Sequence, residues 1–187
     1  MAIEIEAKMR IDGMEEITHR LRAEGASYVG TVTERNTYFD TPEASLKSAD
    51  EGLRVRTELQ PHDNSTRVVV TYKGPRQAGP FKTRREIEFT VSDADAAESL
   101  FDALHYIKVL TFEKRRQTWR LDHCEVVLDT LPELGHFLEI EGPGEAAVDV
   151  VRRRLGLEDH PLITTSYLGL ICGHLEDHGR ARGEFRF

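Results

Sequence analysis

The chain has 187 residues, which is room for one domain of ordinary size. Hydrophobic residues make up 39% of it and charged residues 31%, so the chain can bury a core and global disorder is excluded. The formal charge of -8 argues against nucleic-acid and anionic-membrane partners, because both select basic surfaces. No apolar run approaches the roughly 20 residues that span a bilayer, and the first residues alternate charge instead of forming a signal segment. We therefore expect a cytoplasmic protein.

Alternation of polar and apolar residues predicts strands along most of the chain. In residues 2–10 the pattern repeats every second residue, with apolar side chains on one face and charged side chains on the other. Turn-forming clusters separate most of the further strand-like runs. These runs are residues 31–39, 52–58, 67–73, 84–91, 111–121, 125–129 and 137–141.

Four helices are expected between the groups of strands. The first has its apolar residues at helical spacing from Met14, with Asp12 as its cap, and ends before Gly25. The others are expected from residue 93 or 95 to 104, from 145 to a stop at Gly156, and from 164 or 165 to 172. Residues 1–172 then form a single domain, and the polar tail of residues 173–187 is expected to fray.

The order of these elements predicts an α+β fold with an antiparallel sheet, because no βαβ unit repeats. The polar stripes of the strands consist mainly of Arg, Lys and Glu, whereas one solvated sheet face would carry scattered polar residues. A barrel of about eight strands explains this bias if its interior is polar and its apolar stripes face outward beneath the helices.

Charged side chains of both signs share faces of the predicted strands. The same-face sets are Arg54 with Arg56, Arg84 with Glu86 and Glu88, Lys114 with Arg116, and Glu139 with Glu141. Cations that point into one enclosed space repel one another unless a polyanion lies between them, and clustered carboxylates do so unless a hard divalent cation joins them. A polyphosphate bound with magnesium or manganese satisfies both requirements.

The run Glu4-Ile5-Glu6-Ala7-Lys8 resembles the ExExK signature of the CYTH family, the triphosphate tunnel metalloenzymes. This family includes class IV adenylyl cyclases, thiamine triphosphatases and inorganic triphosphatases. Further motifs follow in the family's order: NTYFDT from Asn36, LRVR from Leu53, TYKGP from Thr71, RREIE from Arg84, KRR from Lys114, LD from Leu128, FLEIE from Phe137 and SYL from Ser166. The resemblance covers roughly residues 4–168.

The resemblance implies an eight-stranded antiparallel tunnel in which basic residues hold a triphosphate and acidic residues hold Mg²⁺ or Mn²⁺. It implies these catalytic cations: Lys8, Arg54, Arg56 and Lys73. It implies these substrate-binding cations: Lys114, Arg116 and either Arg84 or Arg85. It implies these metal carboxylates: Glu4, Glu6, Glu139 and Glu141, with Asp129 close by. Glu86 and Glu88 either serve the metals or orient the cations.

Two activities remain open at this point. A class IV adenylyl cyclase converts ATP to cyclic AMP and pyrophosphate, and the TYKGP, KTRRE and SYL segments resemble that subfamily. A triphosphatase hydrolyses inorganic triphosphate, thiamine triphosphate or a nucleoside triphosphate with the same charged groups. A polyphosphate-binding module without turnover is disfavoured, because the cationic and the acidic stripes are both intact. The resemblance also implies a homodimer, with a triphosphate-bearing small molecule as the partner and no nucleic acid or membrane.

Overall fold

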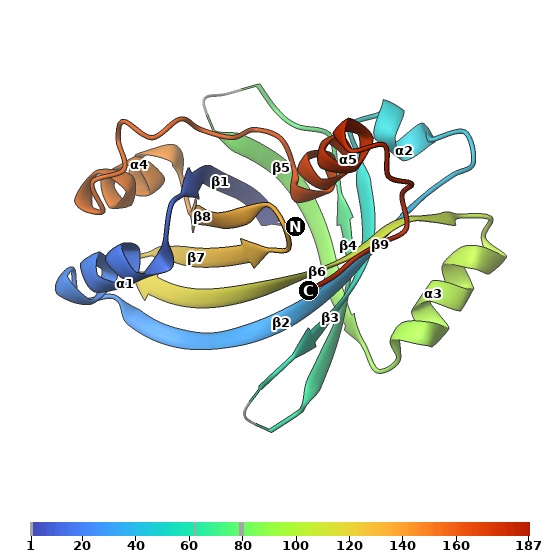
Figure 1. The fold of residues 1–187 in the computed structure, drawn as a ribbon, viewed down its shortest axis with the longest axis horizontal. Helices are drawn as coiled ribbons and strands as arrows, with labels where there is room; N and C mark the ends of the chain where they lie inside the picture. The colour runs from blue at the N-terminus through green and yellow to red at the C-terminus, as the bar shows by residue number, and fades with distance from the viewer. Residues whose placement is uncertain (1, 62, 79–80) are drawn as a thin grey trace.

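The computed structural model describes residues 2–61, 63–78 and 81–187, with the backbone alone described for residues 2–4. In this part of the chain, eight antiparallel strands close into a barrel, in the order β2-β3-β4-β5-β1-β8-β7-β6, and β6 pairs back with β2 (Figure 1). The strands are β1 (Ala2–Ile11), β2 (Ser27–Asp40), β3 (Gly52–Leu59), β4 (Thr66–Lys73), β5 (Lys82–Val91), β6 (Ile107–Leu121), β7 (Cys124–Leu131) and β8 (Gly135–Gly142). The barrel confirms the predicted α+β fold.

The register of the strands is fixed by their two different faces. A slip of one residue would exchange the charged face of a strand for its apolar face, so the correct pairing is strongly favoured. In this register Lys8 of β1 lies opposite Glu139 of β8, and Glu34 of β2 lies opposite Lys114 of β6. Charges of opposite sign therefore meet across neighbouring strands inside the barrel.

Helices lie on the outside of the barrel (Figure 1). They are α1 (Met14–Ala23), α2 (Ser45–Ser48), α3 (Ala94–Ala103), α4 (Glu145–Arg154) and α5 (Tyr167–Asp177). Asp93 caps α3 by accepting hydrogen bonds from the backbone of Asp95 and Ala96, which agrees with a helix start expected at residue 93 or 95. The predicted Asp12 cap of α1 is wrong, because Gly13 occupies the cap position and no side chain bonds the first turn.

The short helix α2 was not predicted from the sequence. It is held by Asp40 at the end of β2, whose carboxylate accepts hydrogen bonds from the backbone N–H groups of Leu46 and Lys47. No helix in the described part of the chain is both long enough and apolar enough to cross a membrane.

The C-terminal tail is more ordered than predicted. The helix α5 begins after its cap Ser166 and continues past Cys172 to Asp177, and a two-residue strand, β9 (Glu184–Phe185), then pairs in parallel with β6. The Phe185 side chain is 1% exposed and packs in the apolar cluster beneath α5. The expected fraying is therefore wrong for these segments, because the buried side chains of Leu175 and Phe185 anchor a mostly polar tail.

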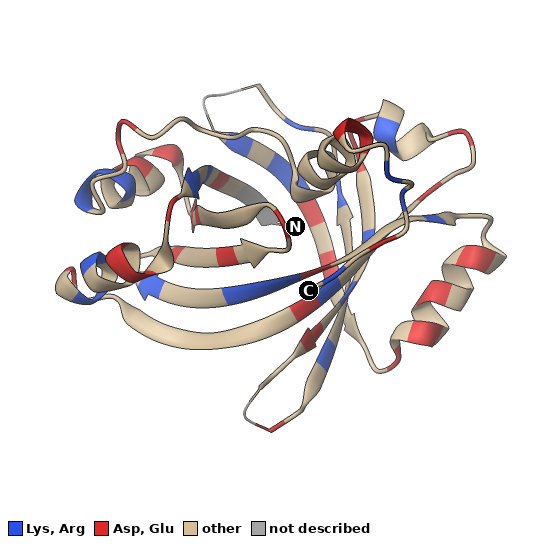
Figure 2. Cartoon of the chain, viewed as in Figure 1, with Lys and Arg blue, Asp and Glu red and all other residues tan. Residues whose placement is uncertain are grey.

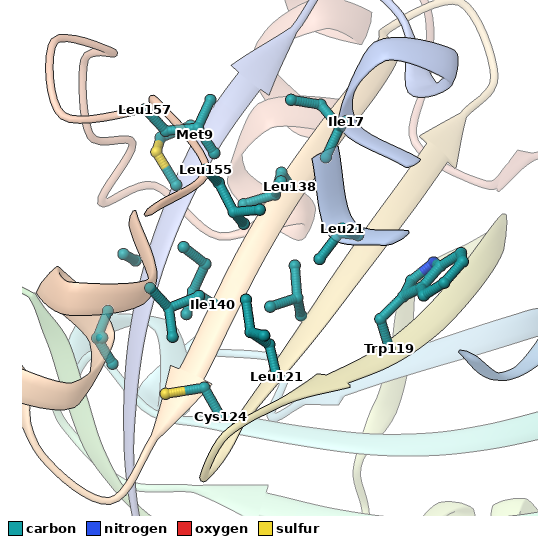
Figure 3. Close-up of a cluster of buried hydrophobic side chains, with 14 of the residues drawn as sticks. Met9, Ile17, Leu21, Trp119, Leu121, Cys124, Leu138, Ile140, Leu155 and Leu157 are labelled. Carbon is teal, nitrogen blue, oxygen red and sulfur yellow. The ribbon is translucent and has the colours of Figure 1, made fainter. Parts of the chain in front are cut away.

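The hydrophobic core lies outside the barrel, between its wall and the helices. The largest cluster packs Ile17 and Leu21 of α1 and Leu155 after α4 against the outer faces of β1 and β8, where Met9 and Leu138 lie (Figure 3). Smaller clusters lie beneath α5 and α3. Because the helices bury the apolar faces of the strands, the barrel interior is left to charged side chains, as predicted.

Candidate functional site

The barrel encloses a cavity of about 1490 Å³ that is lined largely by charged side chains. Blue and red bands mark these residues along the strands in Figure 2. The cations that line it include Lys8, Arg54, Arg56, Lys73, Lys82, Arg84, Lys114 and Arg116. The carboxylates that line it include Glu6, Glu34, Glu58, Glu86, Glu88, Glu139 and Glu141. Apart from Arg85 and Asp129, the predicted site residues whose side chains the structure describes therefore line one cavity.

Three of the predicted metal carboxylates come together as a carboxylate triad. Glu6, Glu139 and Glu141 each offer an oxygen atom, and these atoms lie within 4.8 Å of one another. Glu6 of β1 opposes Glu141 of β8 in register, which explains the convergence. Clustered carboxylate oxygens are the donors that Mg²⁺ and Mn²⁺ prefer, so the triad fits a divalent cation. The side chain of Glu4 lies outside the described residues, although its backbone pairs with that of Arg84.

Asp129 is not a member of the carboxylate triad, and its carboxylate is bound by cations. Asp129 is fully buried, and its carboxylate accepts hydrogen bonds from Arg116 and from Lys114 Nζ at 3.1 Å. Arg116 of β6 and Asp129 of β7 are opposite each other in register. Arg116 Nη2 lies 2.6 Å from both Asp129 Oδ2 and Glu139 Oε2, so Asp129 lies close to the triad, as expected, while its oxygens are engaged by the tunnel cations. A role of Asp129 as a metal ligand stays a prediction.

A second buried carboxylate, Glu34, lies in the centre of a cation cluster and was missed in the sequence. Its oxygens lie 3.4 Å from Lys114 Nζ, 3.5 Å from Arg56 Nη1 and 3.7 Å from Arg116 Nε. Burial alone would raise the pKa of Glu34, but Lys114, Arg116 and Arg56 outweigh it and hold the pKa far below its usual range. The period-two pattern that places Val32 and Tyr38 in the cavity could have identified Glu34.

Lys8 is fixed at the end of the tunnel that α5 covers. Its Nζ lies 3.1 Å from Glu139, donates to the carbonyl oxygen of Thr165 at 3.3 Å, and lies 4.2 Å from the ring centre of Tyr167. Burial disfavours the charged form of Lys8, but Glu139 and Glu6 outweigh this effect and raise its pKa. Burial likewise opposes ionisation of Glu139, whereas Lys8 and neighbouring cations hold its pKa well below normal. Both groups are therefore charged at neutral pH.

Strand β5 resolves the alternative between Arg84 and Arg85. Successive residues of a strand point to opposite faces, and Arg84 is buried in the tunnel whereas Arg85 is exposed on the outer face. Arg84 Nη2 lies 3.0 Å from Asp50 Oδ1 at the end of the α2 loop. The inclusion of Arg85 among the ligands is thus corrected. Lys82, two residues before Arg84 and on the same face, was missed and donates to Glu6.

The two glutamates of β5 whose role was left open lie beside cations. Glu86 forms an ion pair with Lys73. Glu88 lies 3.6 Å from Arg56 Nη2 and accepts a hydrogen bond from Thr71. Both carboxylates line the cavity apart from the triad, which favours a role in orienting cations.

Tyr38 brings a phenol group to the same cations. Its ring stacks on Phe112 with centres 5.9 Å apart, and the residue lines the cavity. Burial would raise its pKa, but nearby cations, with Arg54 and Lys73 foremost, lower it overall. The net attraction of these cations therefore favours the ionised form of the Tyr38 phenol.

Comparison with known proteins agrees with this geometry. The CYTH domain matches residues 2–167 of the chain. Adenylate cyclase CyaB of Aeromonas hydrophila is 32% identical over 174 residues, which cover 88% of this chain and 86% of CyaB. The structure of PH1819 from Pyrococcus horikoshii OT3 has a TM-score of 0.80 at 27% identity and covers 91% of this chain and 99% of that one. HpAC1 from Hippeastrum, which has a dominant triphosphatase activity, has a TM-score of 0.68 at 16% identity, with coverage of 96% and 97%. The chain belongs to the CYTH domain family.

Proposed function

We propose that this protein is a divalent-metal-dependent adenylyl cyclase that converts ATP to cyclic AMP and pyrophosphate. The observation that carries the proposal is the carboxylate triad placed beside the cations of one enclosed cavity. Binding of an anion alone requires the cations but not the triad. The relationship to CyaB supports ATP as the substrate.

The cations are suited to the three phosphates of such a substrate. Arg54, Arg56 and Arg116 can each contact two phosphate oxygens with one guanidinium group, whereas Lys8 and Lys114 act as point charges. Ion pairs with carboxylates fix four of these side chains around the cavity, and Arg54 donates a hydrogen bond to Thr71. A bound triphosphate is thereby oriented along the tunnel, and positioning accounts for much of the catalysis of phosphoryl transfer.

In the cyclase reaction the ribose 3′-hydroxyl attacks the α-phosphorus. The new bond joins O3′ to phosphorus, the bond to the β-phosphate bridging oxygen breaks, and pyrophosphate leaves. The tunnel cations stabilise the negative charge that grows on this leaving group. A divalent cation held by Glu6, Glu139 and Glu141 would neutralise phosphate charge and lower the pKa of the attacking hydroxyl.

A triphosphatase is the second candidate, because the distribution of charge suits a triphosphate with or without a nucleoside. The cations that face the cavity come from β1, β3, β4, β5 and β6, so they can hold a triphosphate whatever group is attached to it. HpAC1, which shares the fold, has a dominant triphosphatase activity. Water then attacks a terminal phosphorus in place of the ribose hydroxyl, and orthophosphate is released.

The two activities are separated by their products. Purified protein is incubated with ATP, inorganic triphosphate or thiamine triphosphate, each with Mg²⁺ and with Mn²⁺, and the products are resolved by anion exchange. Cyclic AMP with pyrophosphate establishes the cyclase. Orthophosphate without cyclic AMP establishes the triphosphatase, and metal-dependent binding without any product establishes a binding module.

Two variants test whether the tunnel residues are responsible for the activity. Glu6→Gln and Lys8→Ala are expected to abolish turnover while leaving the far-UV circular dichroism unchanged. Their matched controls are Glu98→Gln and Lys108→Ala, because Glu98 and Lys108 form an ion pair at 2.6 Å outside the barrel. Unchanged activity in both tunnel variants would contradict the assignment of the site.

A further inference from the structure

The ammonium group of Lys82 forms a hydrogen bond with one of the carboxylates of the triad. Its Nζ donates to Glu6 Oε1, and the Lys82 and Glu6 side chains are 7% and 3% exposed. Lys8 Nζ lies 3.7 Å from the same oxygen atom. Glu6 is thus both a candidate ligand of a divalent cation and the acceptor of an ammonium group. These two roles compete, because positive charges beside one buried carboxylate repel each other.

We propose that Lys82 is an exchangeable cation that couples metal binding to triphosphate binding. Lys82 neutralises Glu6 until a divalent cation binds this carboxylate. The ammonium group of Lys82 is then released and contacts the triphosphate. The inference rests on the proposed function, and it adds Lys82 to the substrate-binding residues as well as an order in which the charges are exchanged.

The contacts of Lys82 and Lys8 show why Lys82 is the lysine that can move. Within the described part of the chain, Glu6 is the hydrogen-bond acceptor that Lys82 contacts. Lys8 is fixed from several sides by Glu139, by the carbonyl oxygen of Thr165 and by the Tyr167 ring. Lysine carries its charge on a flexible four-carbon chain, so breaking one contact is enough to redirect Lys82.

Lys82 is also placed within reach of a bound phosphate. It lines the cavity on the same face of β5 as Arg84, two residues further along the strand. The ring of Tyr38 experiences the charge of Lys82 together with the charges of Arg54 and Lys73. Lys82 therefore contacts the carboxylate triad and shares a strand face with Arg84, one of the cations assigned to the triphosphate.

The proposal predicts opposite effects of one substitution on two affinities. In Lys82→Gln, Glu6 loses its competing cation, so Mn²⁺ alone should bind about tenfold more tightly than to the wild type. With Mn²⁺ saturating, inorganic triphosphate should bind about tenfold more weakly, because one charge-assisted contact is missing. Simple loss of structure would weaken the binding of both Mn²⁺ and inorganic triphosphate, which would contradict the proposal.

Titration calorimetry with Mn²⁺ and with inorganic triphosphate measures both affinities. Lys73→Gln is the matched control, because it removes a tunnel ammonium group that pairs with Glu86 instead of the triad. Its Mn²⁺ affinity should rise clearly less than that of Lys82→Gln. Equal affinities for Mn²⁺ in Lys82→Gln and Lys73→Gln would overturn the proposed exchange, because removal of any one positive charge from the tunnel would then explain the rise in affinity.

A crystal structure of the wild type with Mn²⁺ and no phosphate provides a test that needs no variant. The expected result is Mn²⁺ on the carboxylate triad with Lys82 Nζ displaced from Glu6. Mn²⁺ on the triad with the Lys82 contact retained would overturn the exchange and leave the proposed function intact. Failure of Mn²⁺ to bind the triad would overturn the exchange and the metal dependence of the proposed function together.

Discussion

The guanidinium group of Arg116 donates two parallel hydrogen bonds to the carboxylate of Asp129, at 2.8 Å from Nε to Oδ1 and 2.6 Å from Nη2 to Oδ2. The same Nη2 lies 2.6 Å from Glu139 Oε2. Paired hydrogen bonds of this kind fix the plane of a guanidinium group as well as its position. Asp129 thus orients Arg116 between the barrel wall and the carboxylate triad.

Replacing Asp129 is therefore expected to destabilise the fold as well as the site. Asp129→Asn leaves the Arg116 charge buried without its main partner, which should lower the free energy of unfolding by about 3 to 5 kcal/mol. Urea denaturation measures this change. The control Asp149→Asn breaks the ion pair with Arg153 on the surface of α4 and should cost less than about 1 kcal/mol. Equal losses in the two variants would refute the structural role of Asp129.

Acid is expected to destabilise the protein through its buried carboxylates. The pKa of Glu34 lies below its ordinary value of 4.5 in the folded state, because burial is outweighed by Lys114, Arg116 and Arg56. The folded state therefore binds fewer protons, and the stabilisation is fully present above the ordinary pKa and is lost as the pH falls toward the folded pKa. The pKa of Glu139 is shifted in the same direction, so it adds to the effect.

Urea denaturation between pH 7 and pH 3 tests this dependence. The wild-type free energy of unfolding should be nearly level down to about pH 5 and should fall below that pH. Glu34→Gln should be less stable at pH 7, and its free energy should fall less steeply in acid. A variant with the wild-type slope would show that Glu34 does not contribute to acid denaturation.

The barrel and most of its interior follow from the sequence because both depend on a local pattern. Alternation every second residue places Arg54 with Arg56 and Glu139 with Glu141 on one face, whatever the order of the strands. Glu34 and Lys82 obey the same alternation, but Glu34 lies outside the motifs that mark the family and Lys82 has no role assigned within the KTRRE segment, so neither was named as a site residue. Their roles become visible only when the strands are closed around the cavity.

Other features depend on register and on distant segments. Asp129 is ten residues before Glu139 in the chain, but its partner is set by the pairing of β7 with β6, which places it opposite Arg116. Phe185 is one of few apolar residues in a polar tail, and the apolar cluster beneath α5 explains its burial. Neither relationship leaves a periodic signal in the sequence.

The aromatic ring of Tyr167 is expected to position two tunnel lysines. Lys8 Nζ lies 4.2 Å from the ring centre and Lys114 Nζ lies 4.9 Å from it. A desolvated cation–π contact contributes about 2 kcal/mol, so Tyr167→Leu should reduce kcat/KM more than tenfold. Tyr167→Phe keeps the ring and should retain most of the activity. Steady-state kinetics measures kcat/KM for both variants. An equal loss of kcat/KM in Tyr167→Phe and Tyr167→Leu would assign the effect to the hydroxyl group instead of the ring.

Two consecutive arginines give the sharpest test of which face of β5 meets the substrate. Arg84 lines the cavity, whereas Arg85 is exposed on the outer face of the barrel. Arg84→Met removes a charge-assisted contact with phosphate and should raise KM for the triphosphate substrate about tenfold or more. Arg85→Met removes the same charge and a similar volume from the neighbouring residue, so it controls for the net charge of the protein. Its KM should equal that of the wild type within about twofold, because exposed charges on the outer face are screened by salt. A larger effect at Arg85 than at Arg84 would mean that the substrate does not bind inside the barrel.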